Sequence, residues 1–371
     1  MTLAGLPGRV SSAFRTRAAL GLRPFAAPVM VFIPLGIVLG PGVLGVIPSV
    51  ALAHLDVVIS IALATLGVFI GIAAGREARG ATRLFAAATM EAGVTILVVA
   101  GALLVLLHSW AMPLEASFLL VVALALGVCA SASAAPSTDA ADARGAVEIA
   151  ARVADLDDVM PILLGGIVLV MANPSSHPAL LSTAETIGLG LAIGFAGWLL
   201  VERAHIAAER GVFVLGAVAL LGGAPAYLGY SPLLAGMAAG IFWVVAPGRC
   251  DAIVARELRK VQHPIVVLLL ITAGAGLELT TAGVWLLAPY VVFRSAGKIL
   301  GGWTASRIAP GIAPSDLGAY LIHPGVIGIA FALNLQQVAH ESATAVVFAV
   351  ATGAIASEAL ALVVVPVSRA A

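Results

Sequence analysis

Residues 147–172 read VEIAARVADLDDVMPILLGGIVLVMA, and this run determines how the rest of the chain is interpreted. It is long enough for a helix that crosses a lipid bilayer. Near its middle it nevertheless carries Asp155, Asp157 and Asp158, where an ionised side chain costs several kcal/mol or more. Carboxylates this close together cannot all stay ionised without partners, and they titrate as a group. The run therefore predicts a membrane helix that carries an ion- or proton-binding site.

The composition of the whole chain is that of a membrane protein. Hydrophobic residues make up 61% of the 371 residues and charged residues only 10%, whereas soluble domains average about 45–50% and about 25%. So few charges cannot cover a soluble exterior, which excludes a soluble enzyme, a nucleic-acid-binding protein and a disordered chain. The formal net charge is zero, which gives no sign of a polyelectrolyte partner. Cys129 and Cys250 are expected to be free thiols.

Apolar stretches of spanning length recur from residue 27 to the end of the chain. They predict an all-α integral membrane protein of about twelve transmembrane helices. The predicted spans are 27–47, 56–75, 82–108, 114–135, 147–172, 185–201, 210–224, 230–247, 262–279, 283–304, 315–335 and 342–367. We expect a single transmembrane domain over 27–371, preceded by a basic cytoplasmic segment over 1–26. That segment has no long apolar run and does not fit a signal peptide.

The positions of the basic residues test this topology. Two of the 19 Lys and Arg residues, Arg294 and Lys298, lie inside the span 283–304. If the N-terminus is cytoplasmic and every span crosses the bilayer, the other 17 all fall in cytoplasmic segments. Such a one-sided distribution follows the positive-inside rule. It predicts an even number of spans with both termini in the cytoplasm.

Arg294 and Lys298 are the positive charges that match the aspartates. They are four residues apart and therefore share one face of a helix. Small residues on the same helix would let a neighbour approach closely: Gly297, Gly301 and Gly302. A contact between Asp157 and Lys298 is therefore geometrically reasonable. The alternative is a buried ion pair that only holds the bundle together, but such a pair needs one aspartate and the sequence supplies three.

Two predicted helices contain breaks. The span 114–135 becomes small and polar near its end, at Ser131, Ser133 and Pro136. The span 315–335 contains His323-Pro324-Gly325. Proline removes a backbone hydrogen bond, and the freed carbonyls and helix ends can bind a cation where they line a cavity. Each break adjoins a charged helix in sequence, which favours a transporter site between two inverted repeats. Simple proline kinks are the alternative.

Together these motifs resemble the monovalent cation:proton antiporter superfamily, of the bacterial sodium/proton exchanger type. The most specific parts are Leu156-Asp157-Asp158-Val159, which looks like its paired-aspartate motif, and Gly297-Lys298-Ile299-Leu300-Gly301, which looks like its lysine motif. Weaker matches are 36–41, 131–134, 230–240, 274–277 and 323–325. The resemblance covers roughly 27–367. It implies crossed, interrupted helices and a homodimer in the bacterial inner membrane, in which a core domain moves against a dimer domain.

The resemblance also implies roles for the site residues. Asp158 would be the carboxylate that binds an alkali cation, with Ser131, Ser133 or nearby carbonyls as further oxygen ligands. Asp157 would pair with Lys298 when the cation is absent. Cation and protons would compete for these groups, so exchange needs no cofactor and no covalent chemistry. The paired aspartates imply two protons per cation, which makes the exchange electrogenic.

Other ionisable residues are expected in accessory or structural roles. Asp155 is an extra acid relative to the family and is expected to line the cytoplasmic entry. Arg294 either supports the site or only the packing, and His323 occupies a position that often differs in the family. Glu91 is either a second cavity acid or a packing partner. Glu358 is expected to be structural.

Exchange of sodium, or of lithium or potassium, for protons by alternating access is the function that we expect. A sodium-coupled organic-anion symporter of a related inverted-repeat fold would also have crossed helices, but a lysine facing the aspartates would compete with its cations. A potassium/proton exchanger would differ only in cavity geometry. A channel would need a repeated carbonyl filter, and the sequence has none. A membrane enzyme would need a nucleophile–His pair, metal-ligand spacing or a cofactor fingerprint, and none is found.

Overall fold

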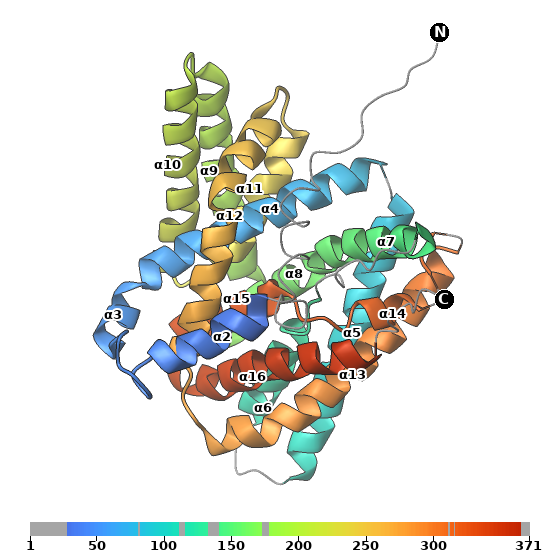
Figure 1. Ribbon diagram of the computed structural model, residues 1–371. Coiled ribbons are helices and arrows are strands. Elements are labelled where there is room, and N and C mark those ends of the chain that lie inside the picture. Colours follow the sequence, from blue (N-terminus) through green and yellow to red (C-terminus); the bar gives the residue numbers. More distant parts are fainter. Residues whose placement is uncertain are drawn as a thin grey trace.

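The computed structural model describes residues 28–80, 82–110, 116–132, 141–172, 178–310, 312–314 and 316–364. Every regular element in these residues is a helix, which confirms the all-α class for this part of the chain (Figure 1). Three predicted features lie outside the described residues: the segment 1–26, Ser133 and Pro136.

The helices are α2 (Pro28–Leu39), α3 (Ser49–His54), α4 (Asp56–Gly80), α5 (Thr82–Ser109), α6 (Ala116–Val128), α7 (Ala141–Asp157), α8 (Val159–Ala172), α9 (Ala179–Arg203), α10 (Ala207–Tyr227), α11 (Pro232–Val245), α12 (Cys250–Ala275), α13 (Thr281–Ile308), α14 (Leu317–Tyr320), α15 (Val326–Val338) and α16 (His340–Val364).

Six of the described helices are long and apolar enough to cross a membrane, judged by length and composition: α4, α5, α9, α10, α12 and α16. Four more are apolar but shorter, namely α2, α6, α11 and α15. Together with the composition, they make the chain an integral membrane protein. The number of spans, about twelve, stays a prediction.

Two boundaries differ from the predicted spans for clear reasons. The span 27–47 is not one helix, because α2 ends at Leu39, just before Gly40-Pro41-Gly42. The prediction of one continuous helix over 147–172 is also wrong, because the chain divides at Asp158 into α7 and α8. Pro161 has no N–H to bond the carbonyl of Asp157, four residues before it. The helix is therefore interrupted beside the two buried aspartates.

Small residues bring two pairs of helices together, backbone against backbone. A Cβ atom added to Gly67 of α4 would lie 2.1 Å from the carbonyl oxygen of Leu233 in α11, and one added to Gly236 would lie 2.2 Å from that of Ala64. α2 meets α12 in the same way, since a Cβ on Gly36 would lie 2.2 Å from the carbonyl oxygen of Ile271. The glycine spacing in these helices thus serves close packing.

The interior contains two hydrophobic clusters. The smaller one joins α9 and α10 to one side of α4, α11 and α12, around Leu221 and Trp243. The larger one contains α2, α5 to α8, α13 to α16 and the other side of α4, α11 and α12. In Figure 1, α9 and α10 stand at the upper left, whereas α5, α6, α13 and α16 pack at the bottom. The candidate site lies in the larger cluster.

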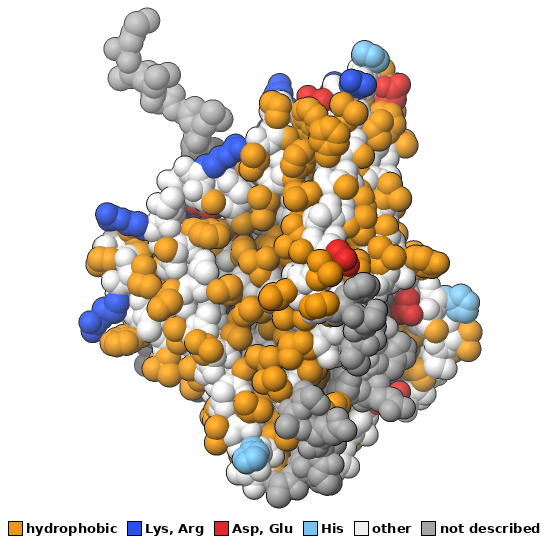
Figure 2. Space-filling view, turned by 180° about the vertical axis from the view of Figure 1, so that it is seen from behind, with side chains coloured by type: hydrophobic (Ala, Val, Ile, Leu, Met, Phe, Trp, Pro, Cys, Tyr) orange, Lys and Arg blue, Asp and Glu red, His pale blue; other side chains and the backbone are white. Residues whose placement is uncertain are grey.

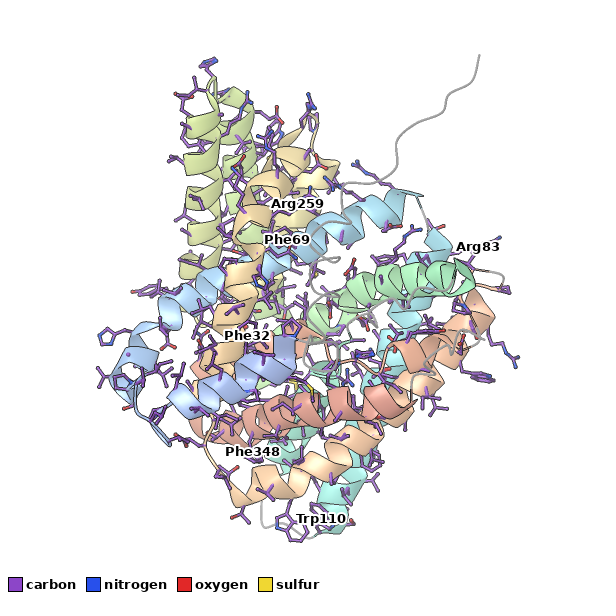
Figure 3. All side chains as sticks on the ribbon, viewed as in Figure 1. Phe32, Phe69, Arg83, Trp110, Arg259 and Phe348 are labelled. Atoms are coloured by element: carbon purple, nitrogen blue, oxygen red, sulfur yellow. The ribbon has the colours of Figure 1, made fainter. Side chains whose placement is uncertain are left out.

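Many large hydrophobic side chains are exposed on the outer surface, for example Leu97, Val105 and Leu180. Figure 2 shows hydrophobic side chains covering one face, with Lys and Arg near the upper and left edges. In Figure 3, Arg83 at the start of α5 and Trp110 just beyond its end lie at different ends of the bundle. Trp110 packs edge-on against Trp285, with ring centroids 6.0 Å apart. Aromatic side chains of this kind are typical of the membrane–water interface.

Candidate ion-binding site

Lys298 is the centre of a buried charge cluster. The residue is 1% exposed, and its Nζ lies 2.7 Å from Oδ2 of Asp157 at the end of α7. Asp157 itself is fully buried. The structure thus brings together the lysine of α13 and the first aspartate of the pair, which are 141 positions apart in the chain.

Glu91 is the second carboxylate on Lys298. Its Oε2 lies 3.3 Å and its Oε1 3.2 Å from the lysine Nζ, and the residue is fully buried in α5. Thr95, one turn further along α5, donates a hydrogen bond of 3.0 Å to Oε1. Sequence reasoning left Glu91 between a cavity role and a packing role. Its position inside an apolar run is the signal in the sequence, but only the fold shows that it shares the ammonium group with Asp157.

Asp158 lies in the break between α7 and α8 and is 7% exposed. The side chain of Ser131 lies close to its carboxylate. Among the described residues, none donates a hydrogen bond to Oδ1 of Asp158, and the same holds for Oδ1 of Asp157. These oxygens keep lone pairs that can accept a proton or a hard cation.

Ser131 belongs to a non-helical segment, 129–132, that follows the end of α6. It lies antiparallel to the non-helical segment 321–325 between α14 and α15, with a bridge between Ala132 and Pro324. The amide of Gly325 donates to the carbonyl of Ser131 at 3.1 Å, and the amide of Gly328 donates to its hydroxyl oxygen at 2.9 Å. Two non-helical segments far apart in sequence therefore meet beside Asp158.

Arg294 joins the same two segments from α13. Its guanidinium group donates to the carbonyl oxygens of Ile322 at 2.6 Å, Ser131 at 2.8 Å and His323 at 3.1 Å. The residue is 1% exposed. Backbone carbonyls freed where helices end carry partial negative charge, which a cation stabilises. Arg294 therefore holds the backbone beside the site, whereas Lys298, one turn further along the same face, holds the carboxylates.

The side chain of His323 contacts a different helix, α16. Its Nδ1 lies 3.0 Å from Oε2 of Glu358 in α16, and the two residues are 4% and 6% exposed. Sequence reasoning considered His323 and Glu358 separately, since they are 35 positions apart. Asp155, by contrast, is an exposed residue one turn before the buried pair.

The charges around Asp158 do not balance within this cluster. Three buried carboxylates, from Glu91, Asp157 and Asp158, face the single ammonium group of Lys298, while Arg294 is hydrogen-bonded to backbone carbonyls. A buried charge without a partner is strongly unfavourable, so such a group takes up a proton or a counter-ion. The arrangement is suited to binding protons and a monovalent cation in competition.

No protein-family model matches the sequence, and no curated protein matches it either. Solved structures do match. One is the sodium proton antiporter MjNhaP1 from Methanocaldococcus jannaschii, whose structure was determined at pH 8. The TM-score is 0.62 at 15% sequence identity, and the match covers 96% of this chain and 92% of the other. The chain therefore shares the fold of that antiporter over almost its whole length.

Proposed function

We propose that this protein exchanges a monovalent alkali cation, sodium in the first place, for protons across a membrane. The observation that carries the proposal is the excess of buried carboxylates over ammonium groups at Asp158, Asp157, Glu91 and Lys298. The similarity in fold to a sodium proton antiporter supports it. We place the protein in a bacterial inner membrane. The distribution of basic residues favours an orientation with both termini in the cytoplasm.

Asp158 is the proposed cation carboxylate. Its unpartnered Oδ1 and the neighbouring Ser131 offer the oxygen ligands that alkali cations take, and Ser133 would add another. Asp157 stays paired with Lys298 while the cation is absent. Cation binding adds a positive charge beside this pair and favours the release of protons, whereas protonation of the carboxylates expels the cation. An empty, charged site would cross the membrane poorly, which couples the two fluxes.

Alternating access is proposed to move α5 to α8 and α13 to α16, with the crossing of segments 129–132 and 321–325, against α4 and α9 to α12. Segments 129–132 and 321–325 meet beside Asp158. This contact supports the proposal of inverted repeats with two interrupted helices, at Pro136 and at Pro324-Gly325. A homodimer with a fixed dimer domain belongs to the same proposal, and native mass spectrometry would test it. Two protons per cation make the exchange electrogenic, so its rate should respond to an imposed membrane voltage. Equal rates at all voltages would contradict that stoichiometry.

The decisive experiment is proton flux in proteoliposomes with a preset pH gradient. Sodium, lithium and potassium are added separately to wild-type protein, Asp158→Asn and Glu278→Gln. Glu278 is an exposed carboxylate between α12 and α13 and serves as the matched control. We expect one of the cations to dissipate the gradient in the wild type and in Glu278→Gln, and the Asp158→Asn rate to fall by a factor of about 100 or more.

The same assay separates the alternatives. Dissipation by potassium but not by sodium would make the protein a potassium/proton exchanger. If no alkali cation acts on folded, inserted wild-type protein, the exchanger proposal is overturned. Sodium uptake that depends on an added organic anion would then favour the symporter.

A further inference from the structure

His323 and Glu358 form a second buried ionisable pair, separate from Lys298 and its carboxylates. Nδ1 of His323 lies 3.0 Å from Oε2 of Glu358, and both residues are almost fully buried. The pair connects the segment 321–325 to α16. None of the proposed exchange steps uses it, although a buried carboxylate and a buried imidazole both require a defined proton.

The surroundings of the pair are otherwise poor in ionisable groups. α13 presents Arg294, which interacts electrostatically with Glu358, and Tyr290, whose hydroxyl donates to the carbonyl of Cys129 at 3.0 Å. The sequences of α2, α6 and α15, which also pack on α16, contain no ionisable side chain. In α12, such residues occur only from Cys250 to His263. Arg294 is therefore the charged side chain that interacts most directly with the pair.

The hydrogen bond determines which ring nitrogen can exchange a proton. If Glu358 is ionised, it only accepts hydrogen bonds, and Nδ1 of His323 then carries the shared hydrogen. The neutral imidazole then has its lone pair on Nε2, and this nitrogen takes up or releases the exchangeable proton. When it releases the proton, the ring becomes neutral and Glu358 remains a carboxylate.

The same residue is linked to the cation site through the backbone. Arg294 donates to the carbonyl of His323 at 3.1 Å and to that of Ser131 at 2.8 Å, and the amide of Gly325 donates to the Ser131 carbonyl at 3.1 Å. A proton on His323 therefore adds positive charge next to Arg294 and the segment that carries Ser131. Like charges repel, so this proton opposes a cation at Asp158.

We infer that His323 and Glu358 form a second proton-binding site, whose proton lowers the affinity of the Asp158 site for the cation. The inference rests on the proposed exchange function and deepens it. Glu358 acts as a counter-ion that keeps the proton on His323, and His323 acts on the cation through Arg294 and the crossing segments. Both are positioning residues, because neither touches the cation.

The test measures the apparent sodium affinity of exchange at pH 6 and at pH 8.5 in proteoliposomes. Wild-type protein is compared with His323→Gln, Glu358→Gln and the control His108→Gln, which replaces an exposed histidine near the end of α5. In both pair variants the loss of affinity between pH 8.5 and pH 6 should be smaller than in the wild type by a factor of about five. The control should match the wild type, and the double variant should equal either single one.

A purely structural hydrogen bond predicts a different result, because its loss changes stability or rate by the same factor at both pH values. Equal pH dependence in the wild type and in His323→Gln overturns the second proton site while the exchange function stands. No exchange of any alkali cation by the wild type overturns the proposed function instead.

Nitrogen NMR of 15N-histidine-labelled full-length protein adds a readout that does not need transport. The signal assigned to His323, by its loss in His323→Gln, should titrate at Nε2 between pH 5 and pH 9. A ring that does not titrate in this range overturns the inference.

Discussion

Arg294 is the single residue that connects most of the site. Its guanidinium group reaches carbonyl oxygens of Ile322, His323 and Ser131, on two segments that are distant in sequence. A lysine ammonium group is a compact point charge without the planar fork that reaches several acceptors at once. The planar shape of the guanidinium group at position 294 thus matters more for this bridge than its charge does. A sequence pattern alone does not show which acceptors such a group reaches.

This geometry predicts a difference between two substitutions. Arg294→Gln should destabilise the protein by about 3 kcal/mol or more, because three carbonyls lose a charged donor in a buried place. Arg294→Lys should recover only part of this loss, although it keeps the charge. Thermal unfolding in detergent, followed by intrinsic tryptophan fluorescence, measures both. Equal stability of Arg294→Lys and the wild type would contradict the geometric argument.

Glu91 and Asp157 share Lys298 but are not equivalent. Asp157 lies 2.7 Å from the ammonium group, and Glu91 lies beyond 3 Å and also accepts from Thr95. Glu91→Gln keeps the acceptor for Thr95 and leaves the closer pair intact. We expect its cation-dependent exchange rate to stay within about threefold of the wild type, whereas Asp157→Asn should lower the rate at least tenfold. Similar losses in both variants would assign the two acids one common role.

At the scale of the helices, helix breaks and glycine contacts determine how the candidate site is built. The interruption at Asp158 follows from Pro161, whose missing N–H leaves the Asp157 carbonyl without its helical partner. The approach of α4 to α11 follows from glycines on both helices, where any side chain would meet a carbonyl oxygen. The proline and the glycines can be seen in the local sequence, but the segments that pack against them are distant in the chain.

The glycine contacts give a prediction with a built-in control. Gly236→Ala places a Cβ atom 2.2 Å from the carbonyl oxygen of Ala64, whereas Gly223→Ala in α10 meets nothing within 4 Å. The first should destabilise the protein by about 2 kcal/mol or more through overpacking. The second should stabilise it by about 0.5–1 kcal/mol through helix propensity. Thermal unfolding of the two variants side by side measures the difference, and a neutral Gly236→Ala would refute the close contact.

Two ion pairs at the predicted cytoplasmic end can be used to test for relative motion of the two groups of helices. Arg76 of α4 pairs with Asp251 of α12 at 2.6 Å, beside residues of the smaller cluster. Glu77, the next residue, pairs with Arg152 of α7 at 2.6 Å and so connects α4 to a helix whose buried residues lie in the larger cluster. If α5 to α8 and α13 to α16 move against α4 and α9 to α12 during exchange, only the second pair has to break.

We therefore expect Glu77→Gln and Arg152→Gln to change the apparent sodium affinity by about threefold, in the same direction. Arg76→Gln and Asp251→Asn should stay within experimental error. Their exposure and pair distance are alike, but α4 and α12 are on the same side of the proposed motion. The affinities come from the proteoliposome assay over a sodium series. Equal effects of the two pairs would argue against that motion.

The sequence by itself determined what depends on composition and on neighbours in the chain. An apolar content of 61% leaves no soluble fold, and three aspartates inside an apolar run predict an ion site. Tertiary structure decided which groups meet. Lys298 faces Asp157 and Glu91, Arg294 ties Ser131 to Ile322, and His323 finds Glu358, across 28 to 207 positions of chain. Hydrophobic periodicity orients a helix toward the interior but does not identify its neighbours, so partners of buried charges follow only from the packed fold.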